Sequence, residues 1–222
     1  MRRLVFPLVV LVLVGSGWAW EGHGRHARER QLGVVATELA GRPVGVHCQS
    51  LWSDLLSIRS DLGEVRVDAN GRLADETGLR RTTCLRLGDL VEDHLAQLDC
   101  LVSVDWSRAD WADPCIARVG HLAHLAGTLA HESMHLRGFL DEATAQCYAV
   151  QETALATVLL GGSRELGEAL ARFELMATTG MPSEYQSSGC RPGGTLDLHP
   201  ETPEFPTERT LAPPPAFGPA FR

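Results

Sequence analysis

The chain has 222 residues and a formal net charge of −8, with 44% hydrophobic and 22% charged residues. This length is enough for one domain with a single hydrophobic core, and the composition is that of a globular protein rather than a disordered one. The negative charge and the lack of a run of basic residues argue against nucleic acid as a partner.

The first twenty residues have the pattern of an export signal. Arg2 and Arg3 precede an almost unbroken apolar run over residues 4–14, and Gly17 and Ala19 place small residues before a cleavage position. The run is shorter than the roughly 20 residues that span a bilayer comfortably. Residues 1–20 are therefore predicted to be a signal peptide or, if retained, an N-terminal membrane anchor. In both cases we expect the rest of the chain to be extracellular or at the cell surface.

The six cysteines agree with export, because all of them follow this segment. An even number of cysteines in an exported chain predicts three disulfides. No two of them are spaced as Cys-x-x-Cys, which argues against a cysteine zinc knuckle or a thioredoxin-type site. The spacing leaves the connectivity open.

Composition divides the remainder into three parts. Residues 21–31 are rich in Arg, Gly and His and are predicted to be a linker. Residues 200–222 are Pro-rich and are predicted to be a disordered tail. The folded domain is expected to span residues 32–199.

The first half of the domain is expected to mix short helices and strands. A short helix is predicted over residues 32–40 and a strand over residues 44–47. Val65 and Val67 alternate with polar residues, and Asn70-Gly71 suits a tight turn, so residues 63–73 are predicted to form a hairpin. Residues 77–98 have helical composition.

The second half is expected to be helical. Asp113 is a good N-cap and Pro114 suits the first helical position, so a long helix is predicted from there to Arg137, with Gly138 ending it. A second helix is predicted from Asp141 to about residue 160, a third over residues 164–177, and loop from residue 180. The predicted class is mainly α with a small β-hairpin or sheet (α+β).

The most informative pattern lies near the end of the long helix, where residues 131–135 spell His-Glu-x-x-His. On a helix this spacing turns His131 and His135 to one side, about one turn apart, with Glu132 beside them. Two imidazoles so placed can hold Zn²⁺, and the glutamate can take a proton from the water that the metal activates.

A catalytic zinc site usually has three protein ligands and a water. Asp141 and Glu142 follow the motif closely, and Glu152 lies farther along the next helix. The helical composition after Asp141 favours Glu142, but Asp141 and Glu152 stay open as third ligands. The simpler alternative is that Asp141 caps that helix and Glu142 lies favourably at its positive end.

Residues 131–141 read H-E-x-x-H-x-x-G-x-x-D, which resembles the metzincin signature. That resemblance implies a turn at Gly138 and Asp141 as the ligand. It also implies a methionine turn, with a tyrosine two residues after the methionine. The chain departs from this pattern, because Met181 and Tyr185 are four residues apart. The start of a second helix at Glu142 resembles the gluzincins, whose glutamate ligand lies on such a helix, although at a longer spacing. The whole stretch also resembles uncharacterised exported actinobacterial proteins with a zincin-like motif.

The resemblance implies a zincin-like domain that hydrolyses peptide bonds. We expect an exported zinc metallopeptidase with Glu132 as general base and a peptide or protein as substrate. Tyr185, Tyr148 and His124 are candidate donors to the oxygen that becomes negative in the transition state. Two alternatives stay open: a zinc-binding protein without turnover, and a disulfide-stapled helical protein in which the motif is accidental.

Overall fold

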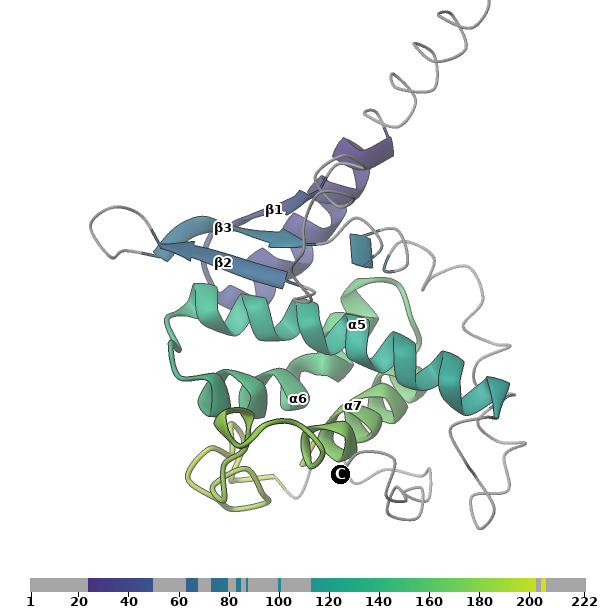
Figure 1. The fold of residues 1–222 in the computed structure, drawn as a ribbon, viewed down its shortest axis with the longest axis vertical. Coiled ribbons are helices and arrows are strands. Elements are labelled where there is room, and N and C mark those ends of the chain that lie inside the picture. Colours follow the sequence, from purple (N-terminus) through teal and green to yellow (C-terminus); the bar gives the residue numbers. More distant parts are fainter. Residues whose placement is uncertain are drawn as a thin grey trace, which may run out of the picture.

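The chain folds into a mainly helical domain with a small sheet, as the predicted α+β class requires. The computed structural model describes residues 24–49, 63–67, 73–79, 83–84, 87, 100, 113–202 and 205–206. In chain order, Figure 1 shows a helix over residues 24–40, named here the N-terminal helix, then β1 (Gly45–Cys48), β2 (Gly63–Val67), β3 (Leu73–Leu79), α5 (Pro114–Arg137), α6 (Glu142–Leu159), α7 (Arg164–Thr178) and the 3-10 helix η1 (Ser183–Tyr185).

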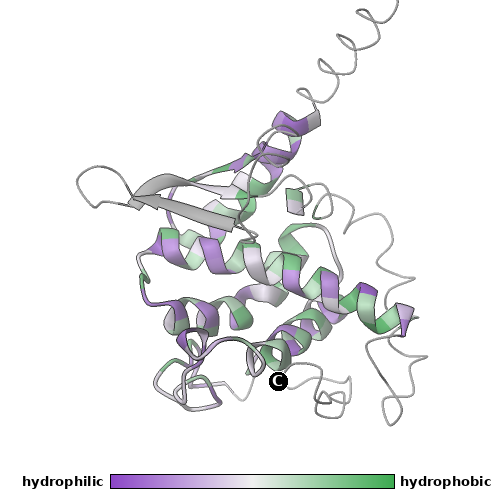
Figure 2. Ribbon diagram, in the orientation of Figure 1, coloured by the Kyte–Doolittle hydropathy of each residue, from purple (hydrophilic) through white to green (hydrophobic). Residues whose placement is uncertain are grey.

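The N-terminal helix corrects the sequence prediction, because residues 24–31 are helical and not a linker. Its first turns are hydrophilic (Figure 2), so they show no apolar periodicity in the sequence. These turns extend a helix whose later residues, Leu32, Val35 and Leu39 among them, are buried in the core. Glu29 supports the first turns through an ion pair with Arg25 and a hydrogen bond with His26 Nδ1.

The sheet has three strands in the order β1-β3-β2. β1 runs parallel to β3, and β2 runs antiparallel to β3, which confirms the predicted hairpin strands. The predicted turn at residues 70–71 lies outside the described residues. β3 continues to Leu79, so the helix predicted from Thr77 is wrong at its start. Thr77 and Leu79 are fully buried two residues apart, which is the spacing of one face of a strand.

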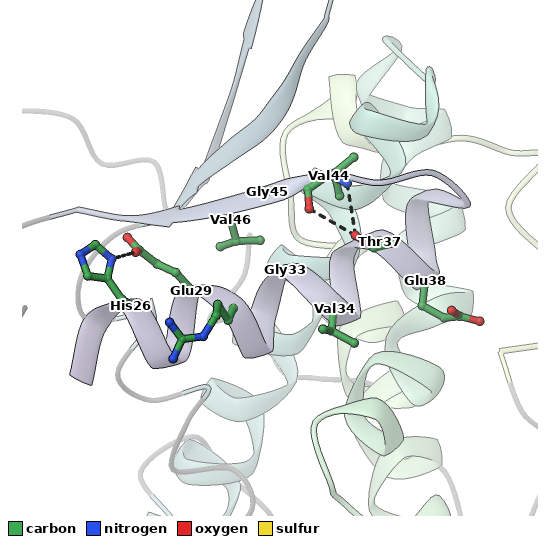
Figure 3. A pocket seen from close by; sticks show the side chains of 10 residues that line it. His26, Glu29, Gly33, Val34, Thr37, Glu38, Val44, Gly45 and Val46 are labelled. Carbon is green, nitrogen blue, oxygen red and sulfur yellow. Dashed lines mark hydrogen bonds and ion pairs between the residues drawn. The ribbon is translucent and has the colours of Figure 1, made fainter. Parts of the chain in front are cut away.

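The N-terminal helix covers the open edge of β1 (Figure 3). The Thr37 hydroxyl accepts a hydrogen bond from the Val44 amide at 3.2 Å and donates one to the Val44 carbonyl at 3.2 Å. Glu29 Oε1 accepts a hydrogen bond from the Cys48 amide at 3.0 Å. An open groove of about 700 Å³ remains between the helix and the strand. The edge is therefore occupied by side chains of the same chain.

The three long helices begin and end within one residue of the predicted positions. Asp113 Oδ1 accepts hydrogen bonds from the amides of Cys115 and Ile116 at the start of α5. Asp141 caps α6 and Ser163 caps α7 in the same way. α5 ends at Gly138, whose φ of 114° and ψ of 5° lie in the left-handed region.

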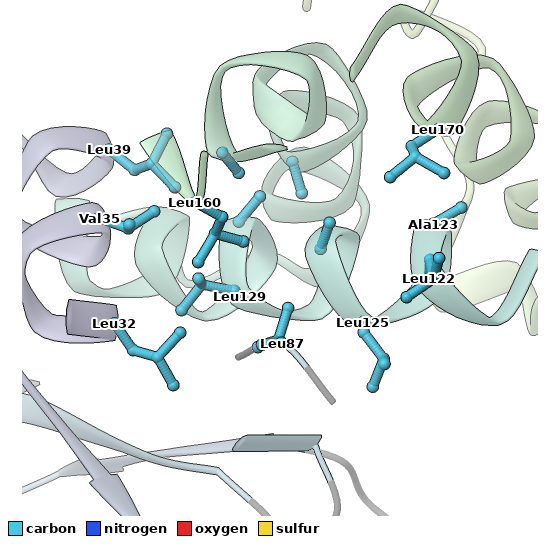
Figure 4. Packing of buried hydrophobic residues seen from close by; sticks show 14 of the residues in the cluster. Leu32, Val35, Leu39, Leu87, Leu122, Ala123, Leu125, Leu129, Leu160 and Leu170 are labelled. Carbon is cyan, nitrogen blue, oxygen red and sulfur yellow. The ribbon is translucent and has the colours of Figure 1, made fainter. Parts of the chain in front are cut away.

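The core lies where α5 packs against the N-terminal helix, α6 and α7 (Figure 4). This core includes Leu129 of α5, Leu160 just after α6, and Val35 of the N-terminal helix (Figure 4). Many buried residues of α5 and α6 are small; these include Ala126 and Ala130 of α5, and Ala145, Ala149 and Ala156 of α6. Small side chains let two helix backbones approach closely, which brings the start of α6 beside the end of α5.

Three disulfides are present, as predicted, and they join Cys48 to Cys84, Cys100 to Cys115, and Cys147 to Cys190. The third ties the loop after η1 to α6. Gln151 of α6 reinforces this link, because its amide donates to the Leu196 carbonyl and accepts from the Leu198 amide, both at 2.8 Å.

Two further expectations bear on the ends of the chain. The disorder predicted from residue 200 is wrong at Phe205, whose aromatic side chain is buried; residues 207–222 lie outside the described residues, as do residues 1–20. Within the described part of the chain, no helix has the length and apolar character needed to cross a membrane.

Replacing Gly138 with alanine is predicted to lower the free energy of unfolding by about 1–2 kcal/mol, because an L-residue is strained in this left-handed conformation. Chemical denaturation of the two proteins measures the difference. Gly33→Ala is the matched control. Gly33 is helical, and an added Cβ there meets only ordinary contacts at 3.8 Å, so this change is expected to be neutral or stabilising. Equal effects of the two changes would contradict the assignment of a special role to Gly138.

Candidate metal centre

The turn at Gly138 reverses the chain between α5 and α6. The Gly138 amide donates to the His135 carbonyl at 2.9 Å, and the Phe139 amide donates to the Met134 carbonyl at 3.1 Å. These two bonds form a Schellman motif, which needs the left-handed residue that glycine supplies. The Arg42 guanidinium donates to the Leu136 carbonyl at 2.8 Å, so a further carbonyl at the C-terminal end of α5 has a hydrogen-bond donor. As a result the last turns of α5 face the first residue of α6.

The reversal brings His131, His135 and Glu142 together. His131 Nε2 lies 3.0 Å from His135 Nε2 and 3.0 Å from Glu142 Oε2, and His135 Nε2 lies 3.4 Å from the same oxygen. Donors about 2.0–2.1 Å from a tetrahedral zinc lie about 3.3 Å apart. The three atoms therefore already have nearly the separation that a shared zinc ion would impose, and two imidazoles with one carboxylate are a donor set that zinc accepts.

The hydrogen bond behind His135 prepares it as a ligand. His135 Nδ1 lies 2.6 Å from the Phe139 carbonyl oxygen, which can only accept, so Nδ1 carries the proton and Nε2 of the neutral ring carries a lone pair. A carbonyl behind a histidine in this way is the usual outer partner of a metal ligand. This lone pair faces the imidazole of His131 and the carboxylate of Glu142. A proton or a cation among the three groups is needed to offset the repulsion between their lone pairs.

His131 is held in its neutral form by its surroundings. Burial lowers the pKa of His131, and the neighbouring His135 lowers it further, while Glu142 acts in the opposite direction. A neutral imidazole is the form that binds metal. The other ring nitrogen, Nδ1, is buried and has no partner within hydrogen-bonding geometry. A buried nitrogen in that position needs an acceptor for its proton.

The three acidic candidates for the third ligand take different places. Glu142 is the first residue of α6 and joins the two histidines. Asp141 is exposed and its Oδ2 accepts from the Thr144 hydroxyl and amide, at 2.7 and 2.9 Å, which also lowers the pKa of Asp141. Asp141 thus acts as the helix cap. Glu152 stands outside the group of donors, and burial raises its pKa although Arg137 and His199 oppose that shift.

Glu132, the expected general base, is buried, with 6% of its surface exposed. It lies on the side of α5 that meets the sheet. The Thr77 hydroxyl on β3 is 3.5 Å from Glu132 Oε2, at the outer limit of a hydrogen bond. The central strand therefore limits the positions available to this carboxylate.

The three candidate donors to a transition-state oxygen are also separated by the fold. The Tyr185 ring, on η1, lies 5.9 Å from the His131 ring between centroids. Tyr148 instead packs edge-on against Phe139. His124 lies two turns before His131 and pairs with Glu174, which raises the pKa of His124. Tyr185 is thus the candidate whose ring contacts a metal-site residue.

Two contributors to the site, Phe139 and Thr77, were missed from the sequence. Phe139 acts through its backbone carbonyl, which no side-chain pattern reveals. The glycine directly before it, Gly138, is the signal that could have indicated this contact, because a Schellman motif folds the following residue back over the helix end. Thr77 lies 55 residues before Glu132 in the chain and reaches it through β3, so no local signal indicates it.

No protein-family model matches the chain, and no curated protein and no solved structure matches it either.

Replacing Glu142 with alanine is predicted to weaken zinc binding by at least about tenfold, because it removes one of the three candidate protein ligands. Replacing Asp141 with alanine is predicted to lower the melting temperature, through loss of the helix cap, and to leave the zinc dissociation constant within about twofold. Competition with a chromophoric chelator measures the zinc affinity of both variants. The reverse pattern, with Asp141 controlling zinc affinity and Glu142 having no effect on it, would contradict the assignment of ligands.

Proposed function

We propose that the protein is an exported zinc-dependent metallopeptidase, in which His131, His135 and Glu142 hold the metal and Glu132 acts as general base. The observation that carries this proposal is the separation of the three donor atoms, 3.0 to 3.4 Å, with a carbonyl behind His135 that leaves its Nε2 free. Two histidines and a glutamate are one of the ligand sets of catalytic zinc.

When bound, zinc would supply two effects, lowering the pKa of a water towards about 7 and polarising the carbonyl of the scissile peptide bond. Glu132 takes the proton of the attacking water and later passes it to the leaving amine. The Tyr185 hydroxyl is the candidate donor to the oxygen that becomes negative, because its ring lies against His131. The disulfide between Cys147 and Cys190 fixes the loop that follows η1.

The exposure of the three proposed ligands favours a catalytic metal site rather than a purely structural one. The side chains of His131 and His135 are 11% and 12% exposed, and that of Glu142 is 41% exposed, so the three donors reach the surface of the domain. Catalytic zinc sites keep one coordination position open, whereas structural sites are closed by four protein ligands. Within the described residues the group contains three such donors and not four.

Within the described residues, the edge of β2 is the edge of the sheet that we propose for an extended peptide. The N-terminal helix covers the edge of β1 through Thr37 and Glu29. β2 forms the other edge and packs against α5, the helix that carries both histidines (Figure 1). Main-chain hydrogen bonds to an edge strand are a common way to hold an extended peptide. We therefore place the peptide or protein substrate along β2.

Export is supported by the three disulfides, because such bonds persist in oxidising compartments. An extracellular or cell-surface peptidase would meet peptide or protein substrates there. Attachment to the membrane would depend on whether residues 1–20 are retained.

A second candidate is a zinc-binding protein without turnover. Its supporting observation is that the donors come from two helices, since both histidines are on α5 and Glu142 is on α6. A metal held by all three would join the helices at their turn. This candidate requires no role for Glu132.

Replacing Glu132 with glutamine distinguishes the two candidates. We expect the variant to keep about one zinc per chain and to lose peptide hydrolysis by at least about 10²-fold, because an amide cannot accept the proton. Zinc content is measured by elemental analysis, and hydrolysis by mass spectrometry of a peptide library incubated with the oxidised protein.

Glu165→Gln is the matched control, since it makes the same chemical change at an exposed position in the first turn of α7. It should keep both zinc and hydrolysis. Zinc bound by the natural protein without cleavage of any library peptide would favour the second candidate, and full activity of Glu132→Gln would contradict the assignment of the base.

A further inference from the structure

A cluster of buried polar side chains lies where α5, α6 and α7 meet, directly beside the metal-site residues of α5. Its centre is Gln146 of α6, which is 3% exposed. The Gln146 amide donates to Glu174 Oε1 at 3.2 Å and to the Thr178 hydroxyl at 3.0 Å, both on α7. Glu174 and Thr178 are themselves buried.

Burying this cluster of polar side chains lowers the stability of the folded state. Glu174, at 2% exposed, places a carboxyl group in the interior, and its Oε2 has no hydrogen-bond partner. The carboxyl group of Glu174 fits because residue 127 of α5 is glycine. A Cβ at that position would lie 2.6 Å from Glu174 Cδ. Glycine inside a helix is destabilising relative to alanine. Apolar residues of similar volume would often be at least as stable, so the polar groups suggest a role other than packing.

The partner that faces Glu174 from the rest of α5 is His124. Its Nδ1 lies 3.9 Å from Glu174 Oε1, and its side chain is 43% exposed. His124 precedes Gly127 by three residues and His131 by seven, so the three lie along one side of α5. The polar cluster therefore extends from the partly exposed His124 at one end to His131 at the other.

The two donor bonds of Gln146 fix the direction of its amide group. A carboxylate can only accept, so the nitrogen of the amide faces Glu174 and the oxygen is turned away from it. The side chain of Gln146 also neighbours the buried side chain of His131, whose Nδ1 has no partner within hydrogen-bonding geometry. The amide oxygen is thus the available acceptor for that nitrogen.

We propose that Gln146 is a positioning residue of the metal centre, whose amide oxygen accepts the Nδ1 proton of His131 and so leaves Nε2 free for the metal. Glu174 and Thr178 hold the amide in this direction. Gln146 would accept the Nδ1 proton of His131 in the same way as the Phe139 carbonyl accepts the Nδ1 proton of His135. This inference rests on the proposed metal site, but not on peptidase activity.

The test replaces Gln146 with methionine, which has similar volume and no hydrogen-bonding amide. The expected result is a zinc dissociation constant that is about 10–100-fold larger, the usual effect of losing an outer partner of a ligand. A second readout is the Nδ1 proton of His131 in long-range ¹H–¹⁵N spectra of the zinc-bound protein, which should be protected from exchange in the natural protein and exposed to exchange in the variant.

Gln151→Met is the matched control. Gln151 is another partly buried glutamine of α6, and its amide bonds to the loop at Leu196 and Leu198 and not to the metal site. The control is expected to lose stability and to keep its zinc affinity. If Gln146→Met does not fold, Glu174→Gln replaces it. This change keeps the shape of the side chain but introduces an amide that can donate as well as accept, so the direction of the Gln146 amide is no longer fixed; weaker zinc binding is expected again.

Three outcomes separate this inference from the proposed function. Unchanged zinc affinity and an unchanged Nδ1 proton in Gln146→Met would overturn the inference and leave the metal site intact. Failure of the natural protein to bind zinc would overturn both. Weaker zinc binding in Gln146→Met, in a protein that cleaves no peptide, would support the inference and count against the peptidase.

Discussion

Two imidazole nitrogens that face each other at 3.0 Å, with a carboxylate oxygen 3.0 and 3.4 Å away, are the constraint on which the rest of this structure depends. Because the Phe139 carbonyl accepts the Nδ1 proton of His135, that ring presents a lone pair to its neighbours. Neutral imidazoles are the form that binds metal, and His131, His135 and Glu142 form a group that could hold a metal ion.

The fold meets this constraint through backbone geometry and small side chains. The left-handed Gly138 closes α5 and returns Phe139 over its end. Both α5 and α6 carry buried alanines, and the first residue of α6 reaches the last turns of α5. The candidate ligands are therefore positioned by helices and by a short turn, which makes their separation less dependent on loop motion.

The parts that the sequence predicted are those set by local chemistry. The caps at Asp113 and Gly138, the three long helices and the pairing of Glu142 with the histidine motif all depend on residues near one another in the chain. The prediction failed where tertiary packing decides. The first turns of the N-terminal helix lack an apolar stripe, and β3 extends because Thr77 and Leu79 are buried against other elements. The contact between Gln146 and Glu174 spans 28 residues, and no local pattern indicates it.

X-ray absorption spectroscopy at the zinc edge of the purified, oxidised protein tests the central claim most directly. The expected spectrum is that of one zinc per chain with two imidazole nitrogens at about 2.0–2.1 Å and oxygen ligands at about 2.0–2.2 Å. Absence of bound zinc after reconstitution, or a bound zinc whose spectrum shows no imidazole, would contradict it.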